Sequence, residues 1–289
     1  MTNLKYDLVQ LTKRNRDGSF QTQHDRLSIL SLIADQLHAF GWRQMRAQDI
    51  KGRHVNKLVA SWKQDGVQHA TIRNRLAVLR WWCARVGRRG VIPPTNDVYQ
   101  LEPRHTIARE SKALVLPAGV LPRVQDRHVQ LSLALQAQFG LRRAESLLIK
   151  PWQADHGHEL VLQGSWTKGG RPRRIPIVTE DQRRVLDEAK ALVRPPASLI
   201  PGDKTYREQL HTYTYHVAKV GLSKLHGLRH AYAQRRFHDL AGFPCPTCGG
   251  PGMRALTPAQ QEADSDARMI LAEEMGHSRE QITTAYIGR

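Results

Sequence analysis

The chain has 289 residues, enough for one large domain or two domains of ordinary size with a buried core. Charged residues make up 24% of it and hydrophobic residues 40%, a balance that excludes an intrinsically disordered chain. Lysine and arginine total 44 against 26 acidic residues, which gives a net charge of +18. Because basic side chains release condensed counterions when they bind phosphates, this charge favours a nucleic-acid partner.

The positive charge is spread along the whole chain. Residues 1–107 carry 18 basic and 8 acidic side chains, a net of +10, and residues 108–289 carry 26 and 18, a net of +8. A basic tail would have concentrated the charge at one end. We therefore expect both halves of the chain to contact the nucleic acid, as a clamp does.

Three features concern the cellular compartment. The sequence contains no run of 18 apolar residues, so we expect no membrane span. The start, MTNLKYDLVQ, lacks the apolar core of a secretory signal. The three cysteines, an odd number in a long chain, argue against a disulfide scaffold and favour a reducing cytoplasm.

The first half of the chain predicts a small all-helical domain at 21–92, preceded by a loose basic arm at 1–20. Apolar residues recur at helical spacing over 25–40, 55–62 and 70–86. The third of these helices also carries basic residues away from its apolar side. We expect them to bind DNA, and they are Arg73, Arg75 and Arg80.

Pro93 and Pro94 open a stretch with little periodicity, which predicts a linker over 93–111. The second half, 112–289, predicts a second domain that is helical except for one β-hairpin. The strands of the hairpin are expected at 160–163 and 174–178, joined by a turn that contains Gly169 and Gly170. The helices are expected over 126–139, 179–193, 204–220, 225–240, 264–275 and 279–287.

Four segments of the second half carry side chains suited to phosphate chemistry. They are GLRRAE at 140–145, WTKGGRPRRIPI at 166–177, HGLRH at 226–230 and MGHSREQITTAY at 275–286. Arginine binds phosphate oxygens with its planar fork, lysine or histidine can supply a proton, and an activated tyrosine can be a nucleophile. Each segment alone is weak evidence, and the order and spacing of the four give the signal.

In that order the segments resemble the catalytic domain of the tyrosine recombinase family, which includes phage integrases and Xer-type recombinases. HATIRNRLAVLRWWCARVG in the first half is similar to the core-binding domain of that family. The resemblance implies a mainly α fold with a small β-hairpin (α+β), with a SAM-like core-binding domain before the catalytic domain. It also implies a site-specific recombinase of a mobile genetic element, active in the bacterial cytoplasm or nucleoid. Such an enzyme would act on double-stranded DNA as a homotetramer, without a cofactor.

The resemblance assigns a catalytic role to six residues of this sequence. They are Arg142, Lys168, His226, Arg229, His277 and Tyr286. The two arginines would hold the scissile phosphate, His277 would hydrogen-bond its oxygen, and His226 would help to take the phenolic proton. Lys168 would be the general acid for the 5′-oxygen. Tyr286 would attack the phosphorus and form a 3′-phosphotyrosyl link.

Several neighbours of these residues have alternative interpretations. Arg143 rivals Arg142, although the family register favours Arg142. Arg173 and Arg174 rival Lys168 but lie past the turn of the hairpin, where we expect them to bind DNA. We expect Glu145 to support an arginine or to cap a helix.

The sequence departs from the family pattern in two places. It ends three residues after Tyr286, so either the native chain ends early or the sequence is truncated, and the usual exchange of a terminal helix between protomers cannot occur. The second departure is a gap of 48 residues between Arg229 and His277, which contains FPCPTCGGPGMRALTP. Cys245 and Cys248 have the spacing of half a zinc site, with His238 as a nearby histidine. A Pro/Gly-rich turn with two reduced thiols is the alternative.

Two other functions stay open at this point. A type IB-like DNA topoisomerase shares much of the residue set but commonly has a lysine where His226 stands. A catalytically silent DNA-binding relative is the second alternative, against which the complete set of six residues argues.

Overall fold

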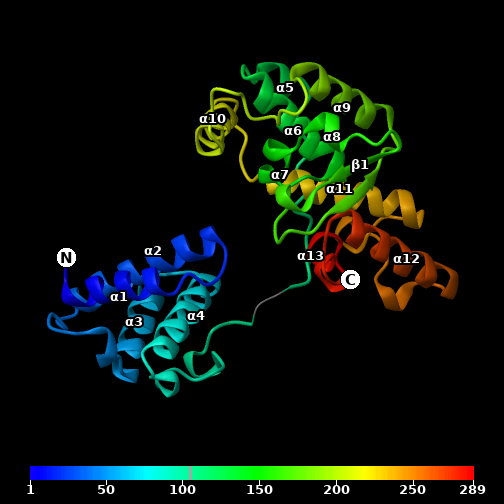
Figure 1. Cartoon of the computed structure of the whole chain (residues 1–289). Coiled ribbons are helices and arrows are strands. Elements are labelled where there is room, and N and C mark those ends of the chain that lie inside the picture. Colours follow the sequence, from blue (N-terminus) through cyan, green and yellow to red (C-terminus); the bar gives the residue numbers. More distant parts are fainter. Residues whose placement is uncertain (104–105) are drawn as a thin grey trace. The chain divides into compact units, whose positions relative to one another are not determined.

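The computed structural model describes residues 1–103 and 106–289 (Figure 1). The chain divides into two compact units, Met1–Arg104 and His105–Arg289, and buried apolar side chains form a core within each. Positions 104–105 of the expected linker lie outside the described residues. Within the described residues, no helix has the length and apolarity that crossing a bilayer requires.

The first unit is helical in its described residues. Its elements are α1 (Asn3–Arg14), α2 (Phe20–Ala39), η1 (Ala47–Asp49), α3 (Gly52–Gln64), α4 (His69–Arg85), η2 (Arg89–Val91) and η3 (Asp97–Tyr99). Leu30, Leu58 and Leu76, from the three predicted helices, lie fully buried in one core. The indole of Trp82 is buried with them and donates a hydrogen bond to the carbonyl of Ala47 at 3.0 Å. The three predicted helices are therefore confirmed as α2, α3 and α4.

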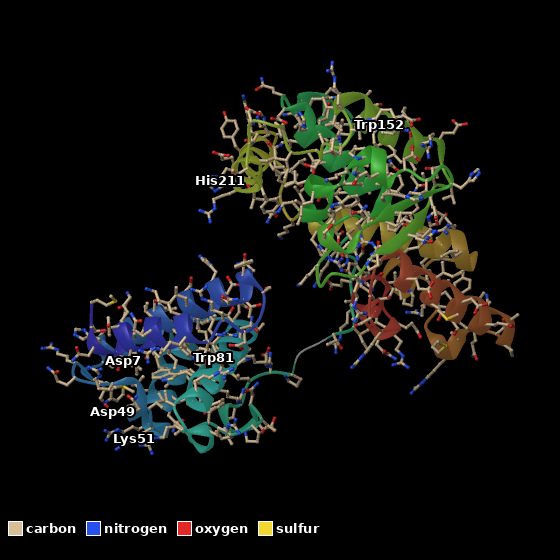
Figure 2. All side chains as sticks on the ribbon, viewed as in Figure 1. Asp7, Asp49, Lys51, Trp81, Trp152 and His211 are labelled. Carbon is tan, nitrogen blue, oxygen red and sulfur yellow. The ribbon has the colours of Figure 1, made fainter. Side chains whose placement is uncertain are left out.

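Residues 1–20, expected as a loose arm, form the packed helix α1 instead. The hydroxyl of Thr2 caps the helix by accepting from the amide of Lys5, and Leu4 and Leu8 are buried in the core of the unit. Asp7 (Figure 2) accepts from Arg46 Nη2 at 2.8 Å and from the amide of Ala47 at 3.1 Å. The expectation failed because Leu4 and Leu8 form only a short apolar stripe, and the charged residues between them, Lys5 and Asp7, interrupt it in the sequence although they pair with other segments of the unit.

The turn between α1 and α2 is fixed by Trp81 of α4 (Figure 2). The carboxylate of Asp17 accepts from the indole nitrogen of Trp81 at 3.2 Å and from Arg26 Nη1 at 3.1 Å. The Arg26 guanidinium lies 4.1 Å from the centre of the Trp81 ring. This stacked arrangement holds Asp17 and Arg26 against α4.

The second unit is also mainly helical, with one antiparallel hairpin. Its helices are α5 (Val120–Arg123), α6 (Arg127–Phe139), α7 (Arg143–Leu148), α8 (Pro151–Ala154), α9 (Glu180–Leu192), α10 (Tyr206–Lys219), α11 (His226–Ala241), α12 (Pro258–Glu274) and α13 (Thr284–Ile287). The strands are β1 (Glu159–Leu162) and β2 (Arg173–Pro176), paired so that Leu160 lies opposite Ile175. The short turns are η4 (Gly164–Trp166), η5 (Pro246–Cys248), η6 (Met253–Ala255) and η7 (Glu280–Ile282).

Helix α11 is central to this unit because it contributes to two cores. Phe237 packs with residues of α6, the hairpin, α9 and α12 in the larger core. Leu228 packs with residues of α6 and α10 in a second, smaller core. At the far end of the larger core, the indole nitrogen of Trp152 (Figure 2) donates to the carbonyl of Val193 at 2.9 Å and ties α8 to the end of α9.

The ends of the chain's last helices differ from the prediction. Helix α12 begins at Pro258, earlier than predicted, because Thr257 caps it and proline is suited to the first helical position. The single helix predicted over 279–287 is instead the turn η7 followed by the four-residue α13.

Helices α5, α7 and α8 were not predicted, because elements of four to six residues are too short to show a helical period.

We expect Leu8→Ala to destabilise the first unit by about 2–5 kcal/mol, since it removes a buried side chain and leaves a cavity. Hydrogen exchange of the α2 amides in the full chain would measure this loss. Tyr6→Ala is the control on the same helix, because Tyr6 is 52% exposed, and it should change stability by less than about 0.5 kcal/mol. Equal effects of the two substitutions would contradict the packed position of α1.

Candidate active site

Five of the six predicted residues come together in the second unit, from segments far apart in the sequence. Arg142 stands directly before α7, His226 and Arg229 lie in the first turn of α11, His277 follows α12, and Tyr286 lies on α13. The carboxy-terminal helix packs against α11, which brings the tyrosine to the two residues of the first turn. Figure 1 shows α13 at the red end of the chain, beside α12.

The phenol of Tyr286 is the centre of this group. Its oxygen lies 3.2 Å from Nε2 of His226, within hydrogen-bonding distance. The rings of His277 and His230 lie against the phenol, with centroid distances of 5.4 Å and 4.5 Å. The Arg229 guanidinium lies 5.8 Å from the centre of the phenol ring. With 8% of its surface exposed, Tyr286 is held inside the site although it lies close to the end of the sequence.

Glu145 organises the arginines on one side of the site. Its carboxylate accepts from Arg142 Nη1 at 2.7 Å and from Arg173 Nη1 and Nη2 at 2.9 and 2.6 Å. It also accepts from the backbone amide of Arg142 at 2.7 Å, which caps α7. Burial alone would raise the pKa of Glu145, but the hydrogen bonds and charges of Arg173 and Arg142 outweigh burial and lower it to about 2. Glu145 thus both supports arginines and caps a helix.

Arg229 is buried, and within the described residues no carboxylate is paired with it. Its Nη1 and Nη2 donate to the backbone carbonyls of Gly140 and Met275, which stand at the C-termini of α6 and α12. Helix C-termini carry partial negative charge and favour a cation there. Burial and the positive charges of Arg142 and Arg173 nevertheless lower the pKa of Arg229 to about 10. The two carbonyls therefore hold the guanidinium in place, but burying its charge costs free energy, which a bound anion would offset.

The glycine of GLRRAE has a steric role in this arrangement. Gly140 ends α6 in a left-handed conformation with φ of 60°, and a Cβ there would lie 2.4 Å from the ring of Tyr232. Any other residue would push this turn away from α11. The carbonyl that receives Arg229 would move with it.

Both predicted histidines are biased toward the neutral form. Burial and the charges of Arg229 and Arg142 lower the pKa of His226, so that its ring can accept a proton from the phenol. The same causes lower the pKa of His277 to about 3. Nδ1 of His277 lies 3.1 Å from the hydroxyl of Thr283, which can donate to it and leave the proton on Nε2.

Buried nitrogen atoms without a hydrogen-bond partner gather around the phenol. Of the six such side-chain nitrogens in the described part of the chain, four belong to this site: Nε of Arg173, Nε of Arg229, Nδ1 of His230 and Nε2 of His277. Unsatisfied buried donors are costly and uncommon, so a group of them indicates a missing acceptor. With three guanidinium groups, one carboxylate and neutral histidines, the site carries a net charge of +2. It is suited to bind an anion.

Two of the cavities in the second unit differ in their position relative to this site. One of about 390 Å³ is lined by Arg142, Arg143, Lys224 and His226 and borders the site. A larger one of about 560 Å³ lies between α5, α6, α9 and α11 and has none of the six predicted residues in its lining. The smaller cavity is the one connected with the chemistry, because it borders the site and has basic side chains in its lining.

Lys168 stands apart from the other five predicted residues. It is exposed on the loop between β1 and β2, and within the described residues no hydrogen bond or ion pair joins it to them. The loop itself is ordered by Thr167, whose hydroxyl donates to the carbonyl of Arg171 at 2.6 Å. The hairpin thus presents the lysine on an exposed tip.

The structure changes the expectation for Arg173. Its side chain, expected on a DNA-binding surface, is 6% exposed, because β2 directs it inward to the Glu145 carboxylate. Arg174, the next residue of the strand, points to the opposite face and is exposed beside Glu159. Because successive side chains of a strand point to opposite faces, these two arginines lie on opposite sides of β2.

The arginines of α4 also have intramolecular contacts. Arg80 donates from Nε and Nη2 to the carbonyls of Pro93 and Thr95, at 2.8 and 2.9 Å, so these donors are occupied within the unit. The guanidinium of Arg75 lies 4.9 Å from the centre of the Trp62 ring. Arg73 is half-buried on the same helix.

Cys245 and Cys248 lie on the turn η5, one buried and the other exposed. Across the described residues, no group of three or more His, Cys, Asp or Glu side chains is arranged to hold a metal ion. The thiols therefore supply two ligands of the four that a structural zinc site needs. They face Thr247 and Gln234 instead, with Sγ–oxygen distances of 3.3 and 3.2 Å.

His230 belongs to the site but was not predicted as a functional residue. It stands one helical turn after His226, and its ring lies 5.4 Å from that of His226 as well as against Tyr286. Burial, His226 and Lys112 lower its pKa to about 4. The spacing of four residues in HGLRH was the available signal, because residues i and i+4 share a helix face.

The lowered pKa of His277 gives a testable effect on stability. A histidine that stays neutral in the folded chain takes up a proton on unfolding below its ordinary pKa. Its stabilising contribution is therefore complete above pH 6.5 and is lost as the pH falls toward 3. We expect it to add up to about 1.4 kcal/mol per pH unit to the slope of the unfolding free energy in this window.

Denaturant unfolding of the full chain without DNA, between pH 4 and pH 7, measures this slope. His277→Asn should make it shallower by about that amount, whereas His24→Asn, at a side chain that is 74% exposed, should leave it unchanged. An unchanged slope in His277→Asn would show that the histidine is charged in the folded chain.

Comparison with known proteins adds independent evidence. A solved integrase of the Tn1549 transposon, in complex with circular intermediate DNA, is 15% identical, with a TM-score of 0.59 over 100% of this chain and 96% of that one. A lambda integrase dimer bound to a core site is 16% identical, with a TM-score of 0.61 over 99% and 95%. The XerH site-specific recombinase, bound to its difH substrate, is 13% identical, with a TM-score of 0.60 over 99% and 81%. At these identities the likeness shows the fold alone.

Sequence models give the family. No curated protein sequence matches the chain. The model of the N-terminal domain of phage integrases matches residues 1–92, and the integrase model matches residues 112–235. Together they match about three quarters of the chain, and the second contains Arg142, Lys168, His226 and Arg229. This chain therefore belongs to the phage integrase family of tyrosine recombinases.

Proposed function

We propose that this chain is a site-specific DNA recombinase that cleaves and rejoins strands through a 3′-phosphotyrosyl intermediate. One observation carries the proposal. The phenol of Tyr286 is hydrogen-bonded to a neutral histidine and faces a buried site with a net charge of +2 and unpartnered nitrogen donors. A DNA phosphodiester supplies both the negative charge and the acceptor oxygens that this site lacks.

The residues have separate roles in this reaction. Tyr286 attacks the phosphorus while His226 takes the phenolic proton. Arg142 and Arg229 bind the non-bridging oxygens, and Nε2 of His277 donates a further hydrogen bond. Preorganised donors of this kind stabilise the charge of the transition state, and the loss of one typically slows a reaction about 100- to 1,000-fold.

Departure of the 5′-oxygen completes the cleavage step, and rejoining is its reverse. The 5′-oxygen of the cleaved strand leaves with a proton from Lys168, and one phosphate ester bond is exchanged for another. The 5′-hydroxyl of a partner strand then attacks the phosphotyrosyl link and gives its proton to Lys168, while the protonated His226 returns a proton to the departing oxygen of Tyr286. Because an ester bond is present throughout, the exchange needs no nucleotide hydrolysis.

The assignment of DNA-binding surfaces follows from the division of the chain. We propose that 21–92 is the core-binding domain, that 93–111 links it to a catalytic domain at 112–289, and that both domains contact double-stranded DNA. Among the predicted DNA-binding residues, Arg73 and Arg75 have no hydrogen bond or ion pair within the described part of the chain, and the side chain of Arg174 is 70% exposed. A lambda integrase tetramer bound to a Holliday junction supports a tetramer for this chain on DNA. Such a protein would act in the bacterial cytoplasm or nucleoid.

We expect a covalent adduct between the protein and a nicked duplex that traps the cleaved strand. A pool of such duplexes with a randomised core identifies the cognate site, since adducts that survive denaturation can be recovered and sequenced. Tyr286→Phe should form no adduct, and Tyr215→Phe, at an exposed tyrosine of α10, should behave as the wild type. Adducts without any sequence preference would favour a topoisomerase, and adducts in Tyr286→Phe would disprove the assigned nucleophile.

We expect Lys168→Ala to slow cleavage of ordinary DNA about 100- to 10,000-fold, since it removes the acid for the leaving oxygen. A substrate with sulfur in place of the 5′-bridging oxygen should restore the rate, because a thiolate leaves without a proton. Ser165→Ala, an exposed position of the same loop, is the control and should cleave both substrates normally. If Lys168→Ala is equally slow on the two substrates, the lysine has another role.

A further inference from the structure

Helix α13 presents the nucleophile but cannot hold its own position. It contains four residues, Thr284–Ile287, and an isolated helix of that length is unstable in water. The place of Tyr286 beside His226 therefore depends on contacts that other segments make with the backbone of α13 and of the residue that follows it.

Three carbonyls of this segment accept hydrogen bonds from distant parts of the unit. The carbonyl of Thr284 accepts from the amide of Ala108 at 3.0 Å. The carbonyl of Gly288 accepts at 2.9 Å from Nη1 of Arg268, a buried side chain of α12 that is paired with Asp264. The third is the carbonyl of Tyr286 itself.

The carbonyl of Tyr286 is held by a glutamine of α11. Nε2 of Gln234 donates to it at 3.0 Å, and the hydroxyl of Thr247 lies 3.4 Å from the same oxygen. Gln234 is 8% exposed, so little water competes for these contacts. It stands two turns after His226 on α11, and one helix thus contacts both the phenol and the backbone of the nucleophile.

The orientation of the Gln234 amide is set by the turn at Cys245–Cys248 and by Ser111. Oε1 accepts from Sγ of Cys248 at 3.2 Å and from the hydroxyl of Ser111 at 3.0 Å. With two donors at its oxygen, the amide must direct its nitrogen to the Tyr286 carbonyl. The turn also packs closely on the end of the chain, since a Cβ at Gly288 would lie 3.1 Å from Cγ2 of Thr247.

We propose that Gln234 is a positioning residue for Tyr286, and that the turn at Cys245–Cys248 holds the Gln234 amide in the orientation that this role needs. The proposal rests on the proposed function, in which Tyr286 is the nucleophile. It assigns a purpose to the long connection between Arg229 and His277. The two thiols then act as a packing element and a hydrogen-bond donor behind the nucleophile.

Gln234→Glu is the sharpest test because it keeps the size of the side chain and removes the amide donor. A carboxylate would repel the Tyr286 carbonyl and displace α13. Single-turnover cleavage of the recovered site should fall about 100-fold, the scale of a misplacement near 1 Å, while DNA affinity stays at the wild-type value. A 5′-sulfur substrate should not restore the rate in Gln234→Glu, although it should in Lys168→Ala. The defect in Gln234→Glu lies in the attack by Tyr286 and not in the departure of the 5′-oxygen.

Cys248→Ala is the second variant, at an exposed position where folding is not at risk. It removes one donor from Oε1 and should lower the rate in the same direction by a smaller factor. Gln261→Glu is the control, since the Gln261 amide also donates to a backbone carbonyl, that of Leu256, but does not contact α13. It should cleave as the wild type does.

Hydrogen exchange of the amides at 284–288 gives a readout that needs no DNA. It should speed up in Gln234→Glu and in Cys248→Ala while the amides of α6 and α9 keep their protection. Wild-type exchange at 284–288 together with wild-type cleavage in Gln234→Glu would overturn the proposal. A wild type that forms no adduct would instead refute the proposed function, and the exchange measurement would still decide whether Gln234 positions Tyr286.

Discussion

Arg229 places a guanidinium group in the interior of the catalytic unit, where two backbone carbonyls receive it. Those carbonyls belong to the C-termini of α6 and α12, so the position of both helices is coupled to one charged side chain. This buried cation is held by dipoles and feels the positive charges of Arg142 and Arg173, and no carboxylate in the described part of the chain is bonded to it. Much of the remaining site follows from this constraint, because burial and the same positive charges lower the pKa values of His226 and His277, and the charges favour an anion.

The carboxylate of Glu145 offsets part of this positive charge. One carboxylate holds two guanidinium groups and caps a helix, and it stays ionised because these hydrogen bonds outweigh the effect of burial. Replacing it would leave Arg173 buried without a partner, which is among the costliest defects in a protein interior. The preorganisation of the site therefore rests on a side chain that has no direct part in the chemistry.

The nucleophile is positioned by a different set of interactions from those that build the phosphate site. The arginines are fixed by α6, α7, β2 and α12, whereas Tyr286 is fixed through the carbonyls of its own short helix. Contacts from 108, α11, the turn η5 and α12 converge on that helix. Helices α11 and α12 serve both sets of interactions, but through different residues, and this difference makes the roles of Gln234 and Arg229 distinguishable by experiment.

The residue pattern alone determined the family resemblance and the mainly helical fold with one hairpin, since these depend on local period and on motif order, and through the resemblance it predicted six residues for the chemistry. Helices α2, α3, α4, α6 and α9 were predictable because apolar residues repeat at helical spacing within each of them. Only the tertiary structure decided that the first 14 residues pack as a helix, that Arg173 turns inward to Glu145 while Arg174 faces outward, and that His230 joins the site. It also decided that the CPTC segment lies behind Tyr286. These features depend on which distant segments of the chain contact one another. A local sequence pattern does not contain that information, because burial and pairing are properties of the folded chain.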